Sequence, residues 1–129
     1  MSEFLKVLIT IKSSLISKHG NCVIIPKNRQ KCFKILRLLY QEGFILSYIY
    51  NKSNNSITIY HNYYQNKPAI ALIKIFNKAS FGTYVKYLDL LNMHKFGVDL
   101  LIISTSKGLK PHYKCIQEKL GGQLLCYIR

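Results

Sequence analysis

Residues 100–108 read Leu-Leu-Ile-Ile-Ser-Thr-Ser-Lys-Gly, an apolar run followed at once by hydroxyl, basic and glycine residues. Four consecutive apolar residues that end at turn residues are typical of a buried strand. A helix is expected over 111–119, with Pro111 in its first turn. The double glycine at 121–122 then turns the chain into a last strand over 123–128. With the elements expected in the rest of the chain, we interpret this order as an α+β fold.

The polar end of this stretch offers a small binding loop. Ser104, Thr105 and Ser106 can donate hydrogen bonds to phosphate, ribose or base edges from close range. Lys107 adds a cation, and Gly108 lacks a Cβ atom, so backbone can approach a ligand or adopt a positive φ there. The spaced glycines of a phosphate-binding P-loop are missing. On physical grounds alone, an ordinary Ser/Thr-rich turn between a strand and a helix is the commoner explanation.

The first half of the chain predicts the order α-β-α-β-β. Periodicity indicates a helix over 4–17 and a strand over 22–25. Asn28 can cap a second helix that runs to Glu42, and Gly43 ends it as a left-handed cap. A hairpin follows, with strands at 45–50 and 57–60. The residues expected on the buried faces of the two helices are Phe4, Leu8, Ile11 and Leu15, flanked by Leu5, Ile9 and Ile16, and then Ile35, Leu36, Leu39 and Tyr40.

A polar break over 65–68 is the expected boundary between two lobes, 1–66 and 67–129. Beyond it, the sequence predicts a strand over 69–76, a loop around Gly82, a short strand at 84–85 and one or two helical turns over 87–93. The second lobe is therefore expected to be β-rich, with one clear helix, and to carry the Ser-Thr-Ser-Lys-Gly loop.

The charge balance points to a polyanionic partner. Nineteen Lys and Arg oppose five Asp and Glu, for a formal net charge of +14, and only Arg29, Arg37 and Arg129 are Arg. Lysine suits phosphate, whereas bidentate reading of a guanine favours Arg, so recognition of nucleic-acid backbone and shape is indicated. Lys27, Arg29 and Lys31 cluster at the start of the second helix, with Lys12 expected beside them as a phosphate-facing patch.

Several other chemistries find little support. Cys22, Cys32, Cys115 and Cys126 form no C-x-x-C pair, so neither a metal site, a disulfide nor a bound cofactor is expected. No apolar run approaches the roughly 20 residues that span a bilayer, and we expect no membrane partner and no small-molecule substrate.

A hydrolase would need Ser104 or Ser106 to meet a histidine (His94 or His112) and a carboxylate (Asp89 or Asp99), which nothing in the sequence brings together. We therefore expect no enzyme.

Ten tyrosines raise the question of base stacking. Those near predicted turns or edges are Tyr60, Tyr63, Tyr64, Tyr84 and Tyr87. Because a tyrosine in a half-buried strand usually needs only packing and one hydroxyl partner, packing is favoured for most of them.

Five motifs occur along the chain in one order and carry a family resemblance. They are Thr10-Ile11-Lys12-Ser13, Gln41-Glu42-Gly43-Phe44-Ile45, Ser104-Thr105-Ser106-Lys107-Gly108, Gly121-Gly122-Gln123 and Cys126-Tyr127-Ile128. Together they resemble protein eight of the small ribosomal subunit, of bacterial and organellar type. Pro26 falls where that family has its Pro after the first short strand. The hydroxyl loop, the double glycine and the Cys-Tyr pair at these spacings are the most specific part.

The resemblance implies two lobes and a role in the small ribosomal subunit. The implied partners are the central domain of the small-subunit rRNA, bound early in assembly, and neighbouring small-subunit proteins. By position, the implied RNA-binding residues are Ser104, Thr105, Ser106, Lys107 and Gly108 in the loop, Gly121 and Gly122 in a close-approach turn, and Lys12, Ser13 and Lys31 as phosphate contacts. The alternatives in other classes are an mRNA-binding repressor and a small serine hydrolase.

The chain also departs from the family pattern. Phe81 replaces the Pro of a Pro-Gly pair, Asp99 replaces a Gly, Gln123 replaces a Glu, and Pro111-His112 replaces a Thr-Asp cap. Losing that cap costs about 1 kcal/mol if nothing replaces it. This drift and the abundance of residues with AT-rich codons favour a mitochondrial, organelle-encoded member, with a plastid or a bacterium as the alternative origin. The first helix belongs to the family fold, so we do not interpret it as a presequence.

Overall fold

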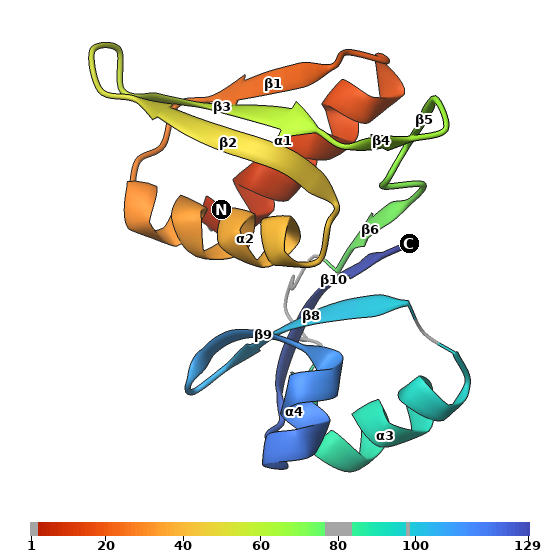
Figure 1. Cartoon of the computed structure of the whole chain (residues 1–129). Helices are drawn as coiled ribbons and strands as arrows, with labels where there is room; N and C mark the ends of the chain where they lie inside the picture. Colours follow the sequence, from red (N-terminus) through yellow and green to blue (C-terminus); the bar gives the residue numbers. More distant parts are fainter. Residues whose placement is uncertain (1–2, 77–83, 98) are drawn as a thin grey trace. The chain divides into compact units, whose positions relative to one another are not determined.

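The protein divides into two compact units, Met1–Ala71 and Leu72–Arg129, which we call unit 1 and unit 2. Figure 1 shows the computed structural model, which describes residues 3–76, 84–97 and 99–129. The loop expected around Gly82 lies outside the described residues. We describe each unit by itself.

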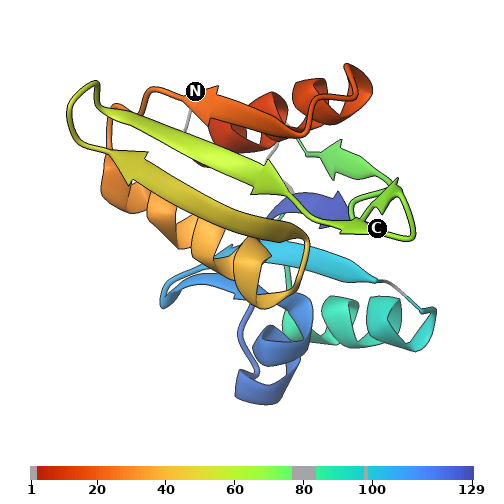
Figure 2. The ribbon, with the colours of Figure 1, turned by 45° about the horizontal axis from the view of Figure 1, so that its top comes forward.

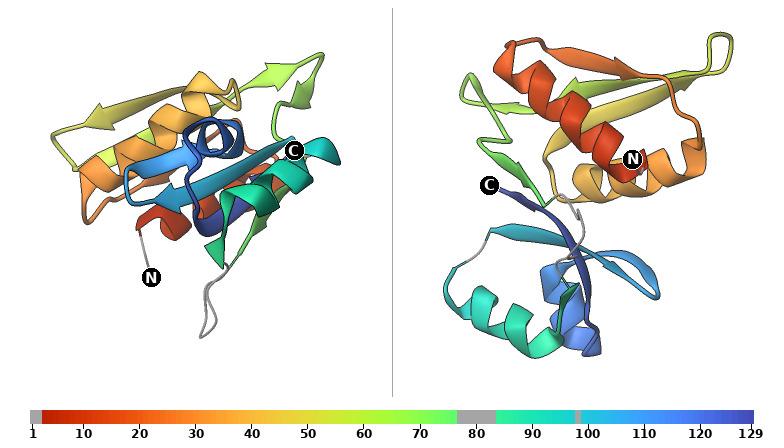
Figure 3. Two further views of the ribbon diagram at one scale, coloured as in Figure 1. Left: turned by 90° about the horizontal axis from the view of Figure 1, so that it is seen from below. Right: turned by 180° about the vertical axis from the view of Figure 1, so that it is seen from behind.

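Unit 1 contains a three-stranded antiparallel sheet with two helices on one face. Its elements are α1 (Glu3–Ile16), β1 (Asn21–Ile24), α2 (Arg29–Gln41), β2 (Ile45–Asn51) and β3 (Ser56–His61). The strands lie in the order β1-β3-β2, so the last strand is in the middle. Figure 3 shows α1 against the sheet from behind, and α2 packs against α1 and β2. The expected α-β-α-β-β order is therefore confirmed.

The buried stripe of α1 differs from the expected one. The buried residues of this helix are Val7, Leu8, Ile11 and Ser14. Phe4 and Leu15 are only partly buried, whereas Ile9 and Ile16 are exposed. The stripe is shifted because Ser14, a polar residue, is satisfied inside the unit. Its hydroxyl donates to the backbone oxygen of Asn21 at 3.1 Å and lies 2.9 Å from Nε2 of His61.

The second helix begins and ends as the sequence predicted. The side chain of Asn28 accepts a hydrogen bond from the N–H of Lys31 at 3.3 Å, which caps the first turn. Gly43 follows the helix with a φ of +80°, in the region that favours glycine. Tyr40, expected on the buried face, is instead exposed and meets the ring of Tyr48 edge-on. Its expected place in the core is taken by other residues of the helix, Cys32 and Leu38.

A small hairpin forms the end of unit 1, so the boundary between the two units lies later in the chain than expected. β4 (Tyr63–Tyr64) pairs with β5 (Lys67–Pro68), and the N–H of Ala69 donates to the oxygen of Asn62 at 2.8 Å. The polar break at 65–68 is the turn of this hairpin, so the division between the units falls after residue 71. The strand expected over 69–76 is shorter, as β6 (Ile73–Ile75).

Unit 2 is built around a longer antiparallel sheet. Its further elements are β7 (Tyr84–Val85), α3 (Tyr87–Lys95), β8 (Leu100–Thr105), β9 (Gly108–Pro111), α4 (His112–Glu118) and β10 (Gly122–Ile128). The strands lie in the order β6-β10-β8-β9, and β7 pairs with the start of β10. Its core joins both helices to one face of the sheet through Val85, Leu90, Leu101, Ile103, Cys115 and Leu124.

Two features of unit 2 correct the sequence prediction. Strand β9 was not expected, so the segment after the hydroxyl residues leads into a strand and not directly into a helix. The one or two helical turns expected over 87–93 form a helix of nine residues, α3. Pro111 ends β9 and occupies the N-cap position of α4, one residue before the first turn, and no side chain caps that helix.

Candidate RNA-binding surface

The five hydroxyl-loop residues form the tip of the β8–β9 hairpin. Ser104 and Thr105 are the last residues of β8, Gly108 is the first of β9, and Thr105 pairs with Gly108 across the ladder. Ser106 and Lys107 are therefore the two turn residues, and both are exposed. Gly108 has a φ of +106°, which a residue with a side chain adopts only with strain. We call residues 104–108 the hydroxyl turn.

The two hydroxyls at the tip have different partners. The hydroxyl of Thr105 donates to the backbone oxygen of Gly108 at 2.8 Å and accepts from the N–H of Lys107 at 3.1 Å. Its proton is thus used inside the turn, and Thr105 shapes the turn where the sequence suggested a donor to a ligand. Ser106 is exposed, and its hydroxyl has no hydrogen-bond partner among the described residues. The Ser106 hydroxyl can therefore reach a ligand.

The double glycine packs against the strand that carries the turn. A Cβ atom on Gly122 would overlap the backbone oxygen of Ser104. A Cβ atom on Gly121 would stand 2.7 Å from the oxygen of Val85 and 3.3 Å from the hydroxyl of Tyr84. Both positions therefore need glycine because β10 begins between β7 and β8. The structure places Gly122 beside the backbone of Ser104 and Gly121 beside that of Val85, which gives both glycines a packing role.

Three side chains lie in one row next to the turn. Tyr84 pairs with Gln123, and Gln123 pairs with Ser104. Directly opposite residues on neighbouring strands share a face of the sheet. The adjacent positions of these strands point into the core, so the row Tyr84–Gln123–Ser104 points away from it. Packing was the interpretation favoured for most tyrosines, but Tyr84 is 70% exposed. Its place beside the turn depends on strand register, which the sequence does not reveal.

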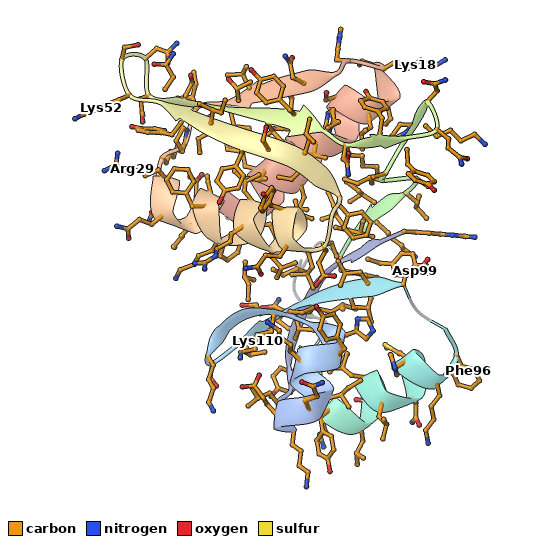
Figure 4. All side chains as sticks on the ribbon, in the orientation of Figure 1. Lys18, Arg29, Lys52, Phe96, Asp99 and Lys110 are labelled. Atoms are coloured by element: carbon orange, nitrogen blue, oxygen red, sulfur yellow. The ribbon has the colours of Figure 1, made fainter. Side chains whose placement is uncertain are left out.

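The charges around the turn are not equivalent. Nζ of Lys110 lies 2.6 Å from Oε2 of Glu118, and this hydrogen bond lowers the pKa of the Glu118 carboxyl. Figure 4 labels Lys110 on β9. Lys110 is thus already neutralised by a carboxylate. Lys107 has no ion pair among the described residues and is the available cation of the turn.

The basic cluster predicted at the start of α2 is present in unit 1. Lys27, Arg29 and Lys31 are all exposed, and the guanidinium of Arg29 lies over the ring of Tyr50, 5.1 Å from its centre. Lys12 was expected beside them, but the α1 lysine that contacts this segment is Lys6, whose Nζ donates to the oxygen of Ile25 at 2.8 Å.

Two further site residues, Lys12 and Ser13, are exposed farther along α1. Together with the basic cluster they are on unit 1, whereas the hydroxyl turn is on unit 2. The predicted site residues therefore form two groups.

The histidines do not meet the serines of the hydroxyl turn. Nδ1 of His94 lies 3.3 Å from Nε2 of His112, whose Nδ1 accepts the N–H of Leu101 at 3.2 Å. Nε2 of His112 must then carry the proton and donate it to His94.

The carboxylates of the hydrolase hypothesis are used elsewhere. Asp89 accepts the N–H of Lys86 at the start of α3 (3.1 Å), and Asp99 lies 3.9 Å from Arg129. These contacts are structural, and the described geometry offers the hydrolase hypothesis no nucleophile–base pair at the hydroxyl turn.

All four cysteines are free and buried. Burial raises the pKa of Cys22 to about 11 and that of Cys126 to about 12, so these thiols stay protonated at neutral pH. Across 3–76, 84–97 and 99–129, the side chains of His, Cys, Asp and Glu nowhere gather in threes as a metal would require. In the same part of the chain, each helix is too short or too polar to cross a membrane.

A lysine-rich chain with a net charge of +14 and an exposed hydroxyl turn has the character of a nucleic-acid-binding protein. The family model described as ribosomal protein S8 matches residues 4–129. The chain therefore belongs to the ribosomal protein S8 family.

Individual relatives extend over nearly the whole chain. The small ribosomal subunit protein uS8 of Legionella pneumophila (strain Lens) is 30% identical over 125 residues, which cover 95% of this chain and 92% of the relative. The uS8 of Baumannia cicadellinicola is 34% identical over 113 residues, 85% and 84% of the two chains. The protein uS8m of Acanthamoeba castellanii is 31% identical over 129 residues, 99% of each. Bacterial relatives and one named as mitochondrial are thus similar to this chain to the same degree.

Proposed function

We propose that the chain is a structural constituent of the small ribosomal subunit that binds the central domain of the small-subunit rRNA and supports subunit assembly. The observation that carries this proposal is the hydroxyl turn of a protein in the S8 family. Its tip exposes the hydroxyl of Ser106, which has no hydrogen-bond partner among the described residues, and the cation Lys107, in a chain with a net charge of +14. Such an excess of positive charge favours a polyanion.

Each residue of the turn has a distinct part in this proposal. Ser106 donates a hydrogen bond to an RNA acceptor, and Lys107 binds phosphate. Thr105 and Gly108 hold the turn in shape through their mutual hydrogen bond. Gly121 and Gly122 act indirectly, by letting β10 pack close to the strand that carries Ser104.

Tyr84 adds a stacking surface to the turn. It is largely exposed and stands in the row Tyr84–Gln123–Ser104, next to the hydroxyls. Exposed aromatic rings stack unpaired bases, at about 1–3 kcal/mol per base. A hydroxyl, a cation and a ring on one edge of the sheet suit irregular RNA, whose bases are accessible.

The cations of unit 1 supply backbone contacts in the proposal. Lys12, Lys27, Arg29 and Lys31, with the hydroxyl of Ser13, are exposed and suit phosphate oxygens. Arg29 is held over Tyr50, so its guanidinium is oriented before RNA binds. Contacts of this kind add affinity and register without reading sequence.

We propose the mitochondrial small subunit as the location. The support is the relative named uS8m, which matches 99% of both chains. Bacterial uS8 proteins match at similar identity, so the experiment should separate the two by locating the tagged chain in fractionated cells.

Sedimentation combined with RNA probing tests the proposed function. The tagged full-length chain should co-sediment with small ribosomal subunits and should protect nucleotides of the central domain of their rRNA from chemical modification. A chain that stays at the top of the gradient under native salt contradicts the proposal. Co-sedimentation with protection confined to another rRNA domain contradicts the assigned site.

A further inference from the structure

Within the described residues of unit 1, no helix or strand covers one face of the three-stranded sheet. Both helices lie on the other face, and Figure 2 looks toward the open side of β1, β3 and β2. Val23, Thr58 and Ile49 stand opposite one another across the three strands. Tyr60 lies two residues after Thr58 on β3 and so on the same face of the sheet. Leu46, at the bulge in β2, and Ile25, just after β1, flank this row. We call these six residues the open face.

Four of the six residues of the open face are large, apolar and exposed, and the polar residues Asn21 and Ser47 stand opposite Tyr60 on the same face. Val23 and Ile49 are each 56% exposed, Leu46 is 59% exposed and Ile25 is 65% exposed. A contiguous group of large, exposed apolar side chains on a soluble protein commonly marks a contact surface.

Charge is distributed very unequally over unit 1. Strands β1, β2 and β3 read NCVI, ILSYIYN and SITIYH, without a single Lys, Arg, Asp or Glu. On the helix side, Lys31, Lys34 and Arg37 are exposed along α2. Lys18 and Lys52 lie in the connections at the two ends of the sheet (Figure 4). Cations therefore cover the helix side and the rim, but not the open face.

This distribution decides between the possible occupants. RNA needs cations along its phosphates, and the open face has none. A second copy would bring a net charge of +14 against another +14, and the rims would repel. A protein with an apolar contact surface bordered by acidic side chains complements both the apolar centre and the basic rim.

We infer that the open face docks a neighbouring protein of the small subunit through an apolar surface with an acidic rim. Unit 1 then holds RNA on its helix side and protein on its sheet side. The inference rests on the proposed place of the chain in the small subunit.

Site-directed photo-crosslinking in purified small subunits tests this inference. A benzophenone amino acid is placed at Ile49 or Val23 of the full-length tagged chain, and at Arg37 as the control on the helix side. The expected result is one and the same protein crosslinked from both sheet positions, at least tenfold above crosslinks to rRNA. Arg37 should crosslink to rRNA.

Substitution provides the second arm. Val23→Glu with Ile49→Glu should lower the amount of that crosslinked protein in small subunits at least fivefold, while affinity for the rRNA fragment changes less than twofold. Ile16→Glu, on an exposed apolar residue outside the sheet, should leave its amount unchanged. If the double Glu variant misfolds by circular dichroism, the β-branched pair Val23→Thr and Ile49→Thr replaces it.

The failures can be told apart. Subunits that contain the wild-type chain but give rRNA crosslinks, different proteins or no crosslink from the two sheet positions overturn the open-face inference alone. An unchanged amount of the crosslinked protein in the Glu or Thr variant also overturns it. A wild-type chain that does not enter small subunits overturns the proposed function and the inference together.

Discussion

Thr105 closes the hydroxyl turn on Gly108, because its hydroxyl donates to the glycine oxygen at 2.8 Å and also accepts the N–H of Lys107. The last residue of β8 thereby fixes the direction in which Ser106 and Lys107 point. Of the three hydroxyls, that of Thr105 organises the turn, and that of Ser106 is exposed, with no hydrogen-bond partner in the part of the chain that the structure describes. A turn that is already ordered loses less conformational entropy on binding than a flexible turn does.

Thr105→Val tests whether the Thr105 hydroxyl stabilises the turn. Valine keeps the branched shape but removes the hydroxyl, and a hydrogen bond of this kind contributes about 0.5–1.5 kcal/mol. We expect the free energy of unfolding to fall by about that amount in urea titrations, together with affinity for rRNA. Thr105→Ser, which retains the hydroxyl, is the control. An unchanged stability of the Val variant would show that the turn does not depend on this bond.

Gly122→Ala should be among the most harmful small substitutions in unit 2. The added methyl group would overlap the backbone oxygen of Ser104 and force β10 away from β8. Overpacking of this kind costs about 1–3 kcal/mol, measurable by thermal or urea unfolding. Gly20→Ala is the matched control, since no other atom lies within 4 Å of the added Cβ and its φ is not positive. Equal effects of the two substitutions would contradict the packing explanation.

His61 should make unit 1 sensitive to acid. The ring is 3% exposed, its Nδ1 has no hydrogen-bond partner in the described residues, and burial lowers its pKa from the usual 6.5. Below pH 6.5 the unfolded chain binds a proton that the folded chain resists, so stability falls as the pH falls. The contribution of this one group can reach about 1.4 kcal/mol per pH unit.

The measurement is the free energy of unfolding from urea titrations between about pH 7.5 and 5, on both sides of the usual histidine pKa of roughly 6.5. His61→Gln keeps a donor for Ser14 but cannot be protonated, so it should flatten the pH dependence. His19→Gln, on an exposed histidine, should not. If the wild type and His61→Gln lose stability in parallel, His61 is not the acid-sensitive group.

The sequence predicted the elements of this fold better than their buried faces and pairing. The cap of α2 at Asn28 and its end at Gly43 depend on local backbone chemistry, and both were predicted. The stripe of α1 was displaced because a buried Ser14 finds partners on β1 and β3, which are distant in the sequence. Local patterns do not contain such information.

In the candidate site, too, local features were predicted and strand pairing was not. The residues of the hydroxyl turn stand out as a motif, but β9 was missed because Gly108–Pro111 combines glycine and proline, which rarely indicate a strand. Without β9, the internal role of Thr105 could not be foreseen. Tyr84 joined the site only through its pairing with Gln123, which is a matter of register.

Salt dependence should separate phosphate contacts from specific ones. If lysines neutralise several phosphates, the logarithm of affinity for the rRNA fragment falls linearly with the logarithm of salt concentration, by roughly 0.9 per contact on duplex-like sites. Lys107→Ala should reduce this slope by roughly one unit and weaken binding to all RNAs. Lys52→Ala, in the β2–β3 turn outside the proposed contacts, should alter the slope less. An affinity that does not respond to salt would contradict the electrostatic account.

The most direct measurement is a pair of binding curves for the wild type and Ser106→Ala on a central-domain rRNA fragment and on a scrambled fragment. The substitution removes the outward hydroxyl but leaves Lys107 and the Thr105 bond in place. We predict that affinity for the central-domain fragment falls about twofold to tenfold, as expected for one hydrogen bond, while affinity for the scrambled fragment stays the same. A wild type that binds both fragments equally, or a Ser106→Ala variant that binds the central-domain fragment as tightly as the wild type, would contradict the assignment of the hydroxyl turn.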